Sequence, residues 1–187
     1  MLEVQKYLKS GKNIVDLESE FSIKTTFHPN LPLVILNYNQ IESPKTETIV
    51  RECRALTLHS KNYDVVAKSM NRFFNWGEVE EEQAHFDFSD FIVQSKEDGS
   101  LVVLYFFDGE WHANTRGSFA FDNLQYQNFT WRDGFCKAMS ISSLSDLKGR
   151  LDEKITYICE FCSPWNKVVR KYAEPKMCLL TAFRGLH

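Results

Sequence analysis

The stretch FIVQSKEDGSLVVLYFF, residues 91–107, places a lysine between two apolar runs and a glycine three positions after the lysine. Both runs, 91–95 and 101–107, are rich in aromatic and β-branched residues, which predicts two strands. The tetrapeptide Lys96-Glu97-Asp98-Gly99 between them is typical of a turn. We therefore expect Lys96 at a strand edge, either in an ordinary solvated hairpin or as a nucleophilic amine, and the rest of the chain has to discriminate between the two.

Length and composition indicate a single folded domain over residues 1–187. Hydrophobic residues make up 43% of the chain and aromatic residues 14%, which is enough for packed sheets and too much for a disordered segment. The formal net charge of −3 excludes a global basic field of the kind that drives non-specific nucleic-acid binding. Any site for a polyanion must therefore be local.

The sequence also indicates the cellular setting. No run approaches the ~18 apolar residues of a membrane span, and the opening residues 1–6 carry mixed charge, unlike a secretory signal. The five cysteines are odd in number, which fits a reducing compartment. We expect a soluble cytoplasmic protein without a membrane partner.

Periodicity and turn residues predict an α+β fold with mainly antiparallel sheets and flanking helices. Residues 1–30 are expected to form a helical N-terminal segment, with two short amphipathic helices within 2–21, and residues 31–187 to form the sheets. Further strands are expected at 33–39, 50–58, 64–69, 110–115, 155–161 and 177–183, and helices at 123–139 and from Ser143 onward.

One turn is predicted by its residue pair. Asp108-Gly109 is the pair that a two-residue type I′ hairpin prefers. It indicates that 101–107 and 110–115 form an antiparallel hairpin.

The sequence lacks the common motifs for zinc and nucleotide binding, or has them in a context that does not support such a site. Cys159 and Cys162 form a C-x-x-C pattern, but no second pair stands at zinc spacing and the two lie three positions apart in a predicted strand, on opposite faces. The five histidines are scattered singly, and there is neither a Walker P-loop nor a G-x-G-x-x-G pattern. A nucleotide must therefore be held in another way.

An amine that attacks a phosphate needs cations nearby, a carboxylate for a ribose or metal, and an aromatic platform. Candidates for the cations are Arg54, Arg72 and Arg116, and Glu160 is a carboxylate in a predicted strand. Each arginine taken alone is more often a surface cation than a phosphate ligand. Together they supply the groups that this chemistry requires.

These residues lie in blocks that resemble the adenylation domain of ATP-dependent RNA ligases of the T-even phage tRNA-repair type, within the covalent nucleotidyltransferase superfamily. The resemblance spans roughly residues 38–183. Its six blocks are Tyr38-Asn39, Glu52-Cys53-Arg54, Met70-Asn71-Arg72-Phe73-Phe74-Asn75, Lys96-Glu97-Asp98-Gly99-Ser100, Arg116-Gly117-Ser118 and Cys159-Glu160-Phe161.

The resemblance implies a role for each matching residue. It implies that Lys96 becomes the lysyl-AMP and that Glu160 holds the ribose. Contacts to the nucleotide are implied for Tyr38, Arg54, Arg72, Phe74 and Arg116, and Gly99 would let the backbone approach the nucleotide closely.

The resemblance further implies an enzyme that uses ATP with Mg²⁺ or Mn²⁺. AMP would pass from the lysine to an RNA 5′-phosphate, and an RNA 3′-hydroxyl would then displace the AMP, with tRNA as one candidate substrate. The metal ligands are unknown.

Two departures from the family pattern stand out. Arg72 and Arg116 occupy positions where this ligase type usually has lysine, which keeps the charge but changes a compact ammonium into a planar fork. After Glu160 no Glu-Gly-apolar-apolar strand or Lys-x-Lys strand follows. We therefore expect the N-terminal and central part of an adenylation domain, with its C-terminal strands missing.

Two alternatives stay open. The chain could be a truncated or non-catalytic module that binds nucleotide or nucleic acid. It could also belong to another covalent nucleotidyltransferase, a DNA ligase or a capping enzyme, although the Glu-Cys-Arg and Arg-Phe-Phe-Asn blocks favour the RNA ligase type.

Overall fold

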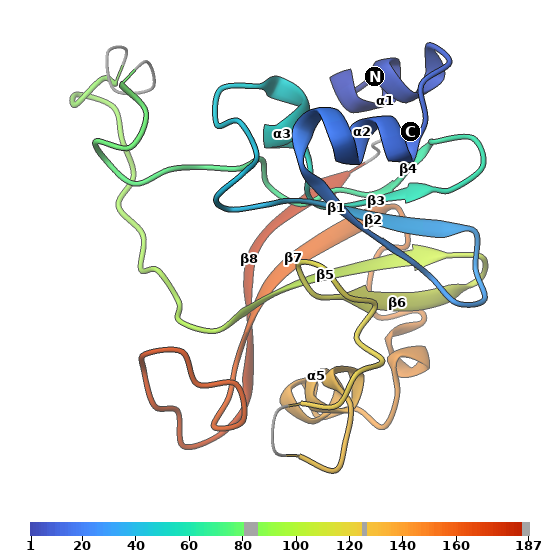
Figure 1. Ribbon diagram of the computed structural model, residues 1–187. Helices are drawn as coiled ribbons and strands as arrows, with labels where there is room; N and C mark the ends of the chain where they lie inside the picture. Colours follow the sequence, from blue (N-terminus) through green and yellow to red (C-terminus); the bar gives the residue numbers. More distant parts are fainter. Residues whose placement is uncertain (81–85, 125–126, 185–187) are drawn as a thin grey trace.

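Two four-stranded antiparallel sheets, stacked between helices, make up the fold (Figure 1). The computed structural model describes residues 1–80, 86–124 and 127–184. The first sheet has the order β1-β2-β3-β4, with β1 (Ile23–Phe27), β2 (Leu33–Tyr38), β3 (Arg54–His59) and β4 (Val65–Ala67). The second has the order β6-β5-β7-β8, with β5 (Ser100–Phe107), β6 (Glu110–Asn114), β7 (Ile155–Cys162) and β8 (Lys176–Arg184). The predicted α+β class with antiparallel sheets is confirmed.

The outer face of the first sheet is covered by α1 (Glu3–Lys9), α2 (Ile14–Phe21) and α3 (Thr48–Glu52). Val34 and Leu36 of β2 are fully buried on this face, in one cluster with Val4 and Leu17 of the helices. The Glu52 carboxylate accepts hydrogen bonds from the backbone amides of Glu3, at 3.1 Å, and Val4, at 2.9 Å. It thereby caps the N-terminus of α1, whose first amides have no partner within the helix.

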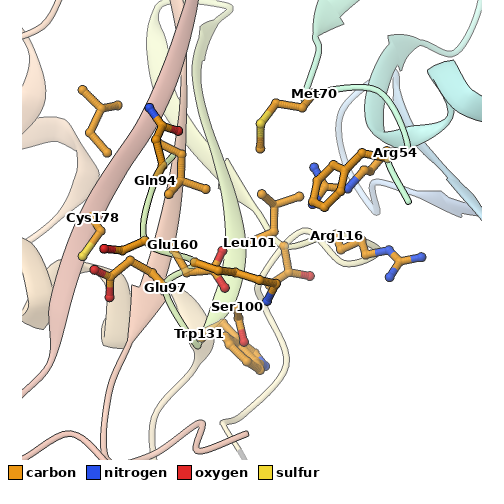
Figure 2. Close-up of a pocket in the computed structure, with 17 residues that line it drawn as sticks. Arg54, Met70, Gln94, Glu97, Ser100, Leu101, Arg116, Trp131, Glu160 and Cys178 are labelled. Atoms are coloured by element: carbon orange, nitrogen blue, oxygen red, sulfur yellow. The ribbon is translucent and has the colours of Figure 1, made fainter. Parts of the chain in front are cut away.

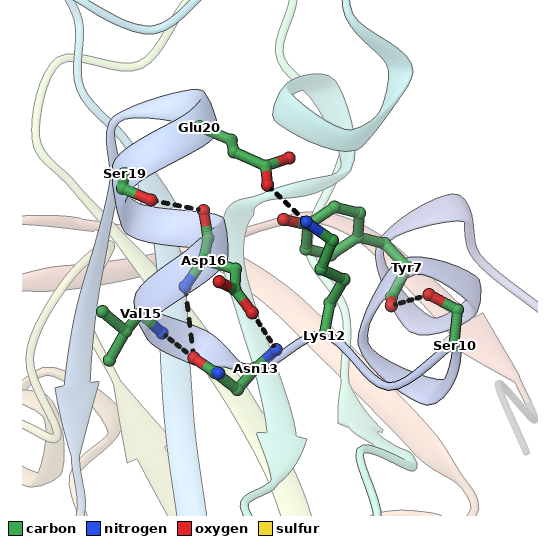
Figure 3. Close-up of polar contacts among 8 residues, drawn as sticks. All are labelled: Tyr7, Ser10, Lys12, Asn13, Val15, Asp16, Ser19 and Glu20. Atoms are coloured by element: carbon green, nitrogen blue, oxygen red, sulfur yellow. Dashed lines mark hydrogen bonds and ion pairs between the residues drawn. The ribbon is translucent and has the colours of Figure 1, made fainter.

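A side-chain cap also begins α2 (Figure 3). Asn13 Oδ1 accepts hydrogen bonds from the amides of Val15, at 2.8 Å, and Asp16, at 3.2 Å, and Asp16 Oδ2 accepts one from the Asn13 amide at 2.9 Å. This reciprocal pair is a capping box. The two predicted N-terminal helices are therefore confirmed, each with its own start signal.

The outer face of the second sheet is covered by α5 (Trp131–Met139) and the 3₁₀ helix η1 (Leu144–Leu147). Phe135 of α5 is fully buried in one cluster with Val102 and Leu104 of β5. The hairpin between β5 and β6 turns at Asp108 and Gly109, whose φ angles are 50° and 82°. Positive φ at both turn residues is the type I′ geometry that this pair predicts.

A third cluster joins the inner faces of the two sheets. Leu33 and Ile35 of β2 contact the group that contains Val103 and Tyr105 of β5 and Ile158 of β7. Alternate residues of β2 and β5 therefore point into different clusters, and these two strands are buried on both faces. This explains why their sequences are nearly continuous apolar runs.

Four predictions about the elements are wrong. Residues 91–95 form no strand: Ile92 is 85% exposed, and β5 pairs with β6 and β7, which leaves no place beside it. The predicted strand at 50–58 begins as α3, and the segment 1–30 contains β1. The predicted helix at 123–139 begins only at Trp131, with its residues 125–126 outside the described ranges.

Contacts made in the folded chain can override local propensity. The helix predicted from Ser143 is present as the short η1, with Ser143 and Asp146 forming its capping box.

Within the ranges that the structure describes, no helix has both the length and the hydrophobicity to cross a bilayer.

Candidate active site

A cavity of about 990 Å³ lies where the two sheets meet the segment before β5 (Figure 2). It is lined by parts of both sheets. Five of the eight residues proposed from the sequence line it, namely Arg54, Lys96, Gly99, Arg116 and Glu160. A cavity of this size is at the upper end of the range for small-molecule sites.

Lys96 lies four residues before β5, in a segment without regular structure. The two residues after it are held by contacts to the C-terminal part of the chain. Asp98 Oδ2 accepts hydrogen bonds from the backbone amides of Val169, at 2.8 Å, and Arg170, at 2.5 Å, which lower the pKa of Asp98. Side-chain tethers, in place of a strand ladder, therefore position the lysine.

Glu97 forms the second tether. Its Oε2 lies 2.9 Å from the ammonium of Lys176 at the start of β8. Hydrogen bonding to that ammonium lowers the pKa of Glu97.

Glu160 supplies the half-buried carboxylate of the cavity. It lies on β7, where it pairs with Leu101 of β5 and Cys178 of β8. Burial raises the pKa of Glu160, and the Gly99 amide, Lys96 and Arg54 oppose this rise. A carboxylate between an amine and a guanidinium can accept hydrogen bonds from hydroxyl groups of a ligand.

Arg54 supplies a guanidinium at the start of β3. Its Nη1 donates a long hydrogen bond of 3.4 Å to Ser69 Oγ, and its Cζ lies 4.8 Å from the ring centroid of Phe73. Burial lowers the pKa of Arg54, but a guanidinium stays protonated in proteins, so the cost of burial favours binding of an anion.

Arg116 supplies the second guanidinium in the lining. Its Nε donates to Asn37 Oδ1 at 3.0 Å, and its Cζ lies 4.3 Å from the ring centroid of Tyr38. On the same ring, the Cζ of Arg72 lies at 4.2 Å. Tyr38 therefore carries two guanidinium groups within cation–π distance.

Three residues proposed from the sequence, Tyr38, Arg72 and Phe74, lie outside the lining of the cavity. Arg72 is 6% exposed and donates to the carbonyls of Ser43, at 3.3 Å, and Gln40, at 3.4 Å. The structure thus places Arg72 as an anchor of the loop after β2.

Gly99 approaches protein backbone closely. A Cβ added at Gly99 would lie 2.2 Å from the carbonyl oxygen of Phe161 in β7. The close approach expected at this glycine is therefore made to a neighbouring strand, which is sufficient to explain the missing side chain.

Two aromatic residues in the lining were not among those proposed from the sequence. Phe73 lines the cavity in place of its neighbour Phe74 and is 57% exposed, and Trp131 contributes from the first turn of α5. The Arg72-Phe73-Phe74 run contained the signal for Phe73, since consecutive side chains of an extended segment point to opposite sides. Nothing local to Trp131 indicated its place.

Among the described residues, the one cluster of side chains that could hold a metal does not suit magnesium. Within the described ranges, the cluster of three such side chains is Glu97, Cys162 and Cys178. Mg²⁺ prefers oxygen ligands, so two thiols do not fit it.

A profile of the RNA ligase family matches residues 52–185, which include all five charged residues in the lining of the cavity. The chain belongs to this RNA ligase family. It is also 33% identical, over 93% of its length, to a putative bifunctional polynucleotide kinase/RNA ligase of Autographa californica nuclear polyhedrosis virus. The chain spans only 27% of the length of that relative. The family membership supports the T4-type RNA ligase resemblance that the sequence blocks indicate.

Proposed function

We propose that this chain is the nucleotide-binding part of an ATP-dependent RNA ligase, with the nucleotidyltransferase fold, and that Lys96 is its nucleophile. The observation that carries the proposal is the convergence of Lys96, Arg54, Arg116 and Glu160 on one cavity, inside the range that matches the RNA ligase family. These four side chains come from separate elements, so the fold has gathered them.

The first step is attack of the neutral Lys96 amine on the α-phosphorus of ATP. A phosphorus–nitrogen bond forms, the bond between the α-phosphorus and the oxygen bridging to the β-phosphate breaks, pyrophosphate leaves, and the nitrogen releases one proton to the solvent. Arg54 and Arg116 face the charge that develops on the phosphate oxygens, the position at which fixed cations accelerate phosphoryl transfer. ATP enters as its Mg²⁺ complex, and no residue of this chain is assigned to the metal.

The remaining groups orient the nucleotide. Glu160 accepts hydrogen bonds from the ribose hydroxyls, and Phe73 and Trp131 offer ring faces to the base. Tyr38 and Arg72 support the site from behind by holding Arg116 and the loop after β2.

Two further steps complete the reaction. The AMP passes to an RNA 5′-phosphate, and an RNA 3′-hydroxyl attacks that activated phosphate to form the phosphodiester and release AMP. The first of these steps breaks the phosphorus–nitrogen bond, forms a phosphorus–oxygen bond and frees the Lys96 amine. The second exchanges one phosphorus–oxygen bond for another. Charge develops on phosphate oxygens in both, so the same cations can serve them.

The test is covalent labelling from ATP that carries the label in its α-phosphate. We expect the wild type to acquire one AMP and Lys96→Ala to acquire none. Lys61→Ala, at an exposed lysine outside the lining of the cavity, should label normally. The measurement is the label and the mass of the intact protein. Labelling of Lys96→Ala would refute the assignment of the nucleophile.

The rival reading, a module that binds nucleotide without reacting, has its own signature in the same experiment. It predicts ATP binding by calorimetry with no covalent label in the wild type. The chain covers only 27% of the length of its relative, and the binding module is therefore tested as a second candidate.

A further inference from the structure

Three side chains that could ligate a metal, from three separate segments, meet at the edge of the cavity, and two of them line it. One ligand atom from each of Glu97, Cys162 and Cys178 lies within 4.8 Å of the other two. Glu97 belongs to the segment before β5, Cys162 ends β7, and Cys178 lies in β8. Figure 2 shows the Cys178 sulfur directed toward Glu97 and Glu160.

Strand register explains the meeting of the two thiols. Cys162 pairs with Lys176 across the β7–β8 ladder, so Cys178, two residues further along β8, is its diagonal neighbour on the same face. The sequence pattern directs attention to Cys159 and Cys162, but Cys159 contributes to the opposite face, in the cluster under α5. The pair that can act together is thus separated by the whole β7–β8 connection.

We propose that Glu97, Cys162 and Cys178 bind a soft divalent cation, with Zn²⁺ as the best match. Two thiolates and a carboxylate are the ligand types that zinc takes, and three protein ligands leave the fourth tetrahedral position to water. The site is separate from the proposed chemistry of Lys96 and needs no nucleotide.

The geometry requires little movement. Tetrahedral ligands about 2.3 Å from zinc lie about 3.8 Å apart. The Cys162 Sγ and Glu97 Oε2 atoms are already 3.9 Å apart, and no pair in the cluster exceeds 4.8 Å. Side-chain rotations can close the remaining gap of roughly 1 Å without a shift of either strand.

Charge and access also fit. With two thiolates and one carboxylate as ligands, the zinc complex carries a net negative charge. The Lys176 ammonium, 2.9 Å from Glu97 Oε2, can balance this charge. The Tyr172 hydroxyl, 3.4 Å from the same oxygen, supplies a hydrogen bond that orients the carboxylate. Cys178 and Glu97 line the cavity, which gives the ion a path to the buried Cys162.

Binding would release the protons of the two thiols to the solvent. It would also join the segment that carries Lys96 to the last two strands of the sheet. The bound ion would thus reinforce the contacts of Glu97 and Asp98 that hold this segment.

The test is titration of the reduced, chelator-treated protein with Co²⁺ as a spectroscopic stand-in and then with Zn²⁺. We expect one equivalent of Co²⁺ to give the thiolate-to-metal charge-transfer bands and the intense visible bands of tetrahedral coordination, and Zn²⁺ to displace it. Zn²⁺ should also raise the thermal unfolding midpoint of the wild type, because it binds the folded state.

The variants separate this site from adventitious thiol binding. Cys178→Ser should abolish the charge-transfer bands and the Zn²⁺-dependent rise of the midpoint, and Glu97→Gln should weaken binding by roughly tenfold or more. Cys159→Ala, on the same strand but the opposite face, should bind like the wild type. Cys178 and Glu97 are partly exposed, so both variants should fold even if a change at Cys162 does not.

The proposal fails if the wild type gives no charge-transfer bands with Co²⁺. It also fails if Cys178→Ser and Glu97→Gln bind as tightly as the wild type, or if Cys159→Ala loses binding as they do while its thermal midpoint without metal is unchanged. None of these outcomes depends on adenylation, so failure of the zinc site and failure of the proposed ligase function are distinguishable.

Discussion

The Glu160 side chain lies under two opposing influences. Burial disfavours its ionised form and raises its pKa, while the Gly99 amide, Lys96 and Arg54 favour the ionised form. The net effect is a raised pKa, so the folded state binds the proton more tightly than the unfolded state does. The contribution of Glu160 to stability is therefore lost as the pH rises from its unfolded to its folded pKa, and the cost persists at neutral pH.

We predict that Glu160→Gln raises the thermal unfolding midpoint at neutral pH and slows formation of lysyl-AMP by about 10²-fold. The amide keeps a hydrogen-bond acceptor but removes the buried charge. Unfolding scans from acidic to neutral pH should show the gain shrinking as the pH falls toward the unfolded pKa. A midpoint lower than that of the wild type at neutral pH would mean that the contacts to Lys96 and Arg54 outweigh burial.

Gly99 has an equally specific role at the residue scale, since the Phe161 carbonyl occupies the space that a side chain would need. We predict that Gly99→Ala destabilises the protein by about 1–3 kcal/mol, the range for overpacking. Urea unfolding measures the change. Gly117→Ala is the matched control because its Cβ would meet nothing closer than 3.9 Å, and equal losses in the two variants would contradict the steric explanation.

Side-chain caps decide where the two N-terminal helices begin. Glu52, part of the Glu-Cys-Arg block of the ligase resemblance, caps α1 from the end of α3. It thus connects two helices that are far apart in the sequence. Asn13 caps α2 from within its own segment.

We predict that Glu52→Ala lowers the free energy of unfolding by about 1–3 kcal/mol because two amides of α1 lose their acceptor in a buried place. Asn13→Ala should cost about 1 kcal/mol, the usual value for loss of an N-cap. Urea unfolding followed by circular dichroism measures both. A smaller loss for Glu52→Ala than for Asn13→Ala would show that water replaces the Glu52 carboxylate.

The two sheets share one inner cluster, which contains Ile35 of the first sheet and Ile158 of the second. Because this cluster joins both sheets, neither inner face can be exposed without the other. The cavity lies at the same junction, with Arg54 from one sheet and Glu160 from the other. The relative placement of the sheets therefore sets the distance between these two charges.

We predict that the molecule unfolds as one cooperative unit. Ile35→Ala, at a position 1% exposed, should cost about 2–5 kcal/mol. Trp111 lies in β6 of the other sheet and packs in one cluster with Trp131 and Trp165, so in a Trp76→Phe background the fluorescence reports on that half of the protein. The fluorescence transition should shift together with the circular dichroism signal. Two separate transitions would show that the sheets fold independently.

Local patterns in the sequence were sufficient for the elements whose signals lie within a few residues. Asp108-Gly109 predicted the hairpin because a positive φ at both positions is a property of those residues themselves. The helices in 2–21, the antiparallel β7 and β8, and the α+β class followed from periodicity in the same way. Lys96, Arg54, Gly99, Arg116 and Glu160 were proposed from their blocks and were found in one cavity.

Only the tertiary structure decided which apolar segments find a partner strand and which residues meet across the sheets. Residues 91–95 have strand propensity, but the neighbours of β5 are already β6 and β7, and a strand without a partner leaves its backbone groups unpaired. Contacts between distant parts of the chain also made Arg72 an anchor of a loop, and the β7–β8 register made Cys178, not Cys159, the neighbour of Cys162. Propensity and motif depend on residues close together in the chain, whereas strand register and sheet packing bring together residues more than a dozen positions apart.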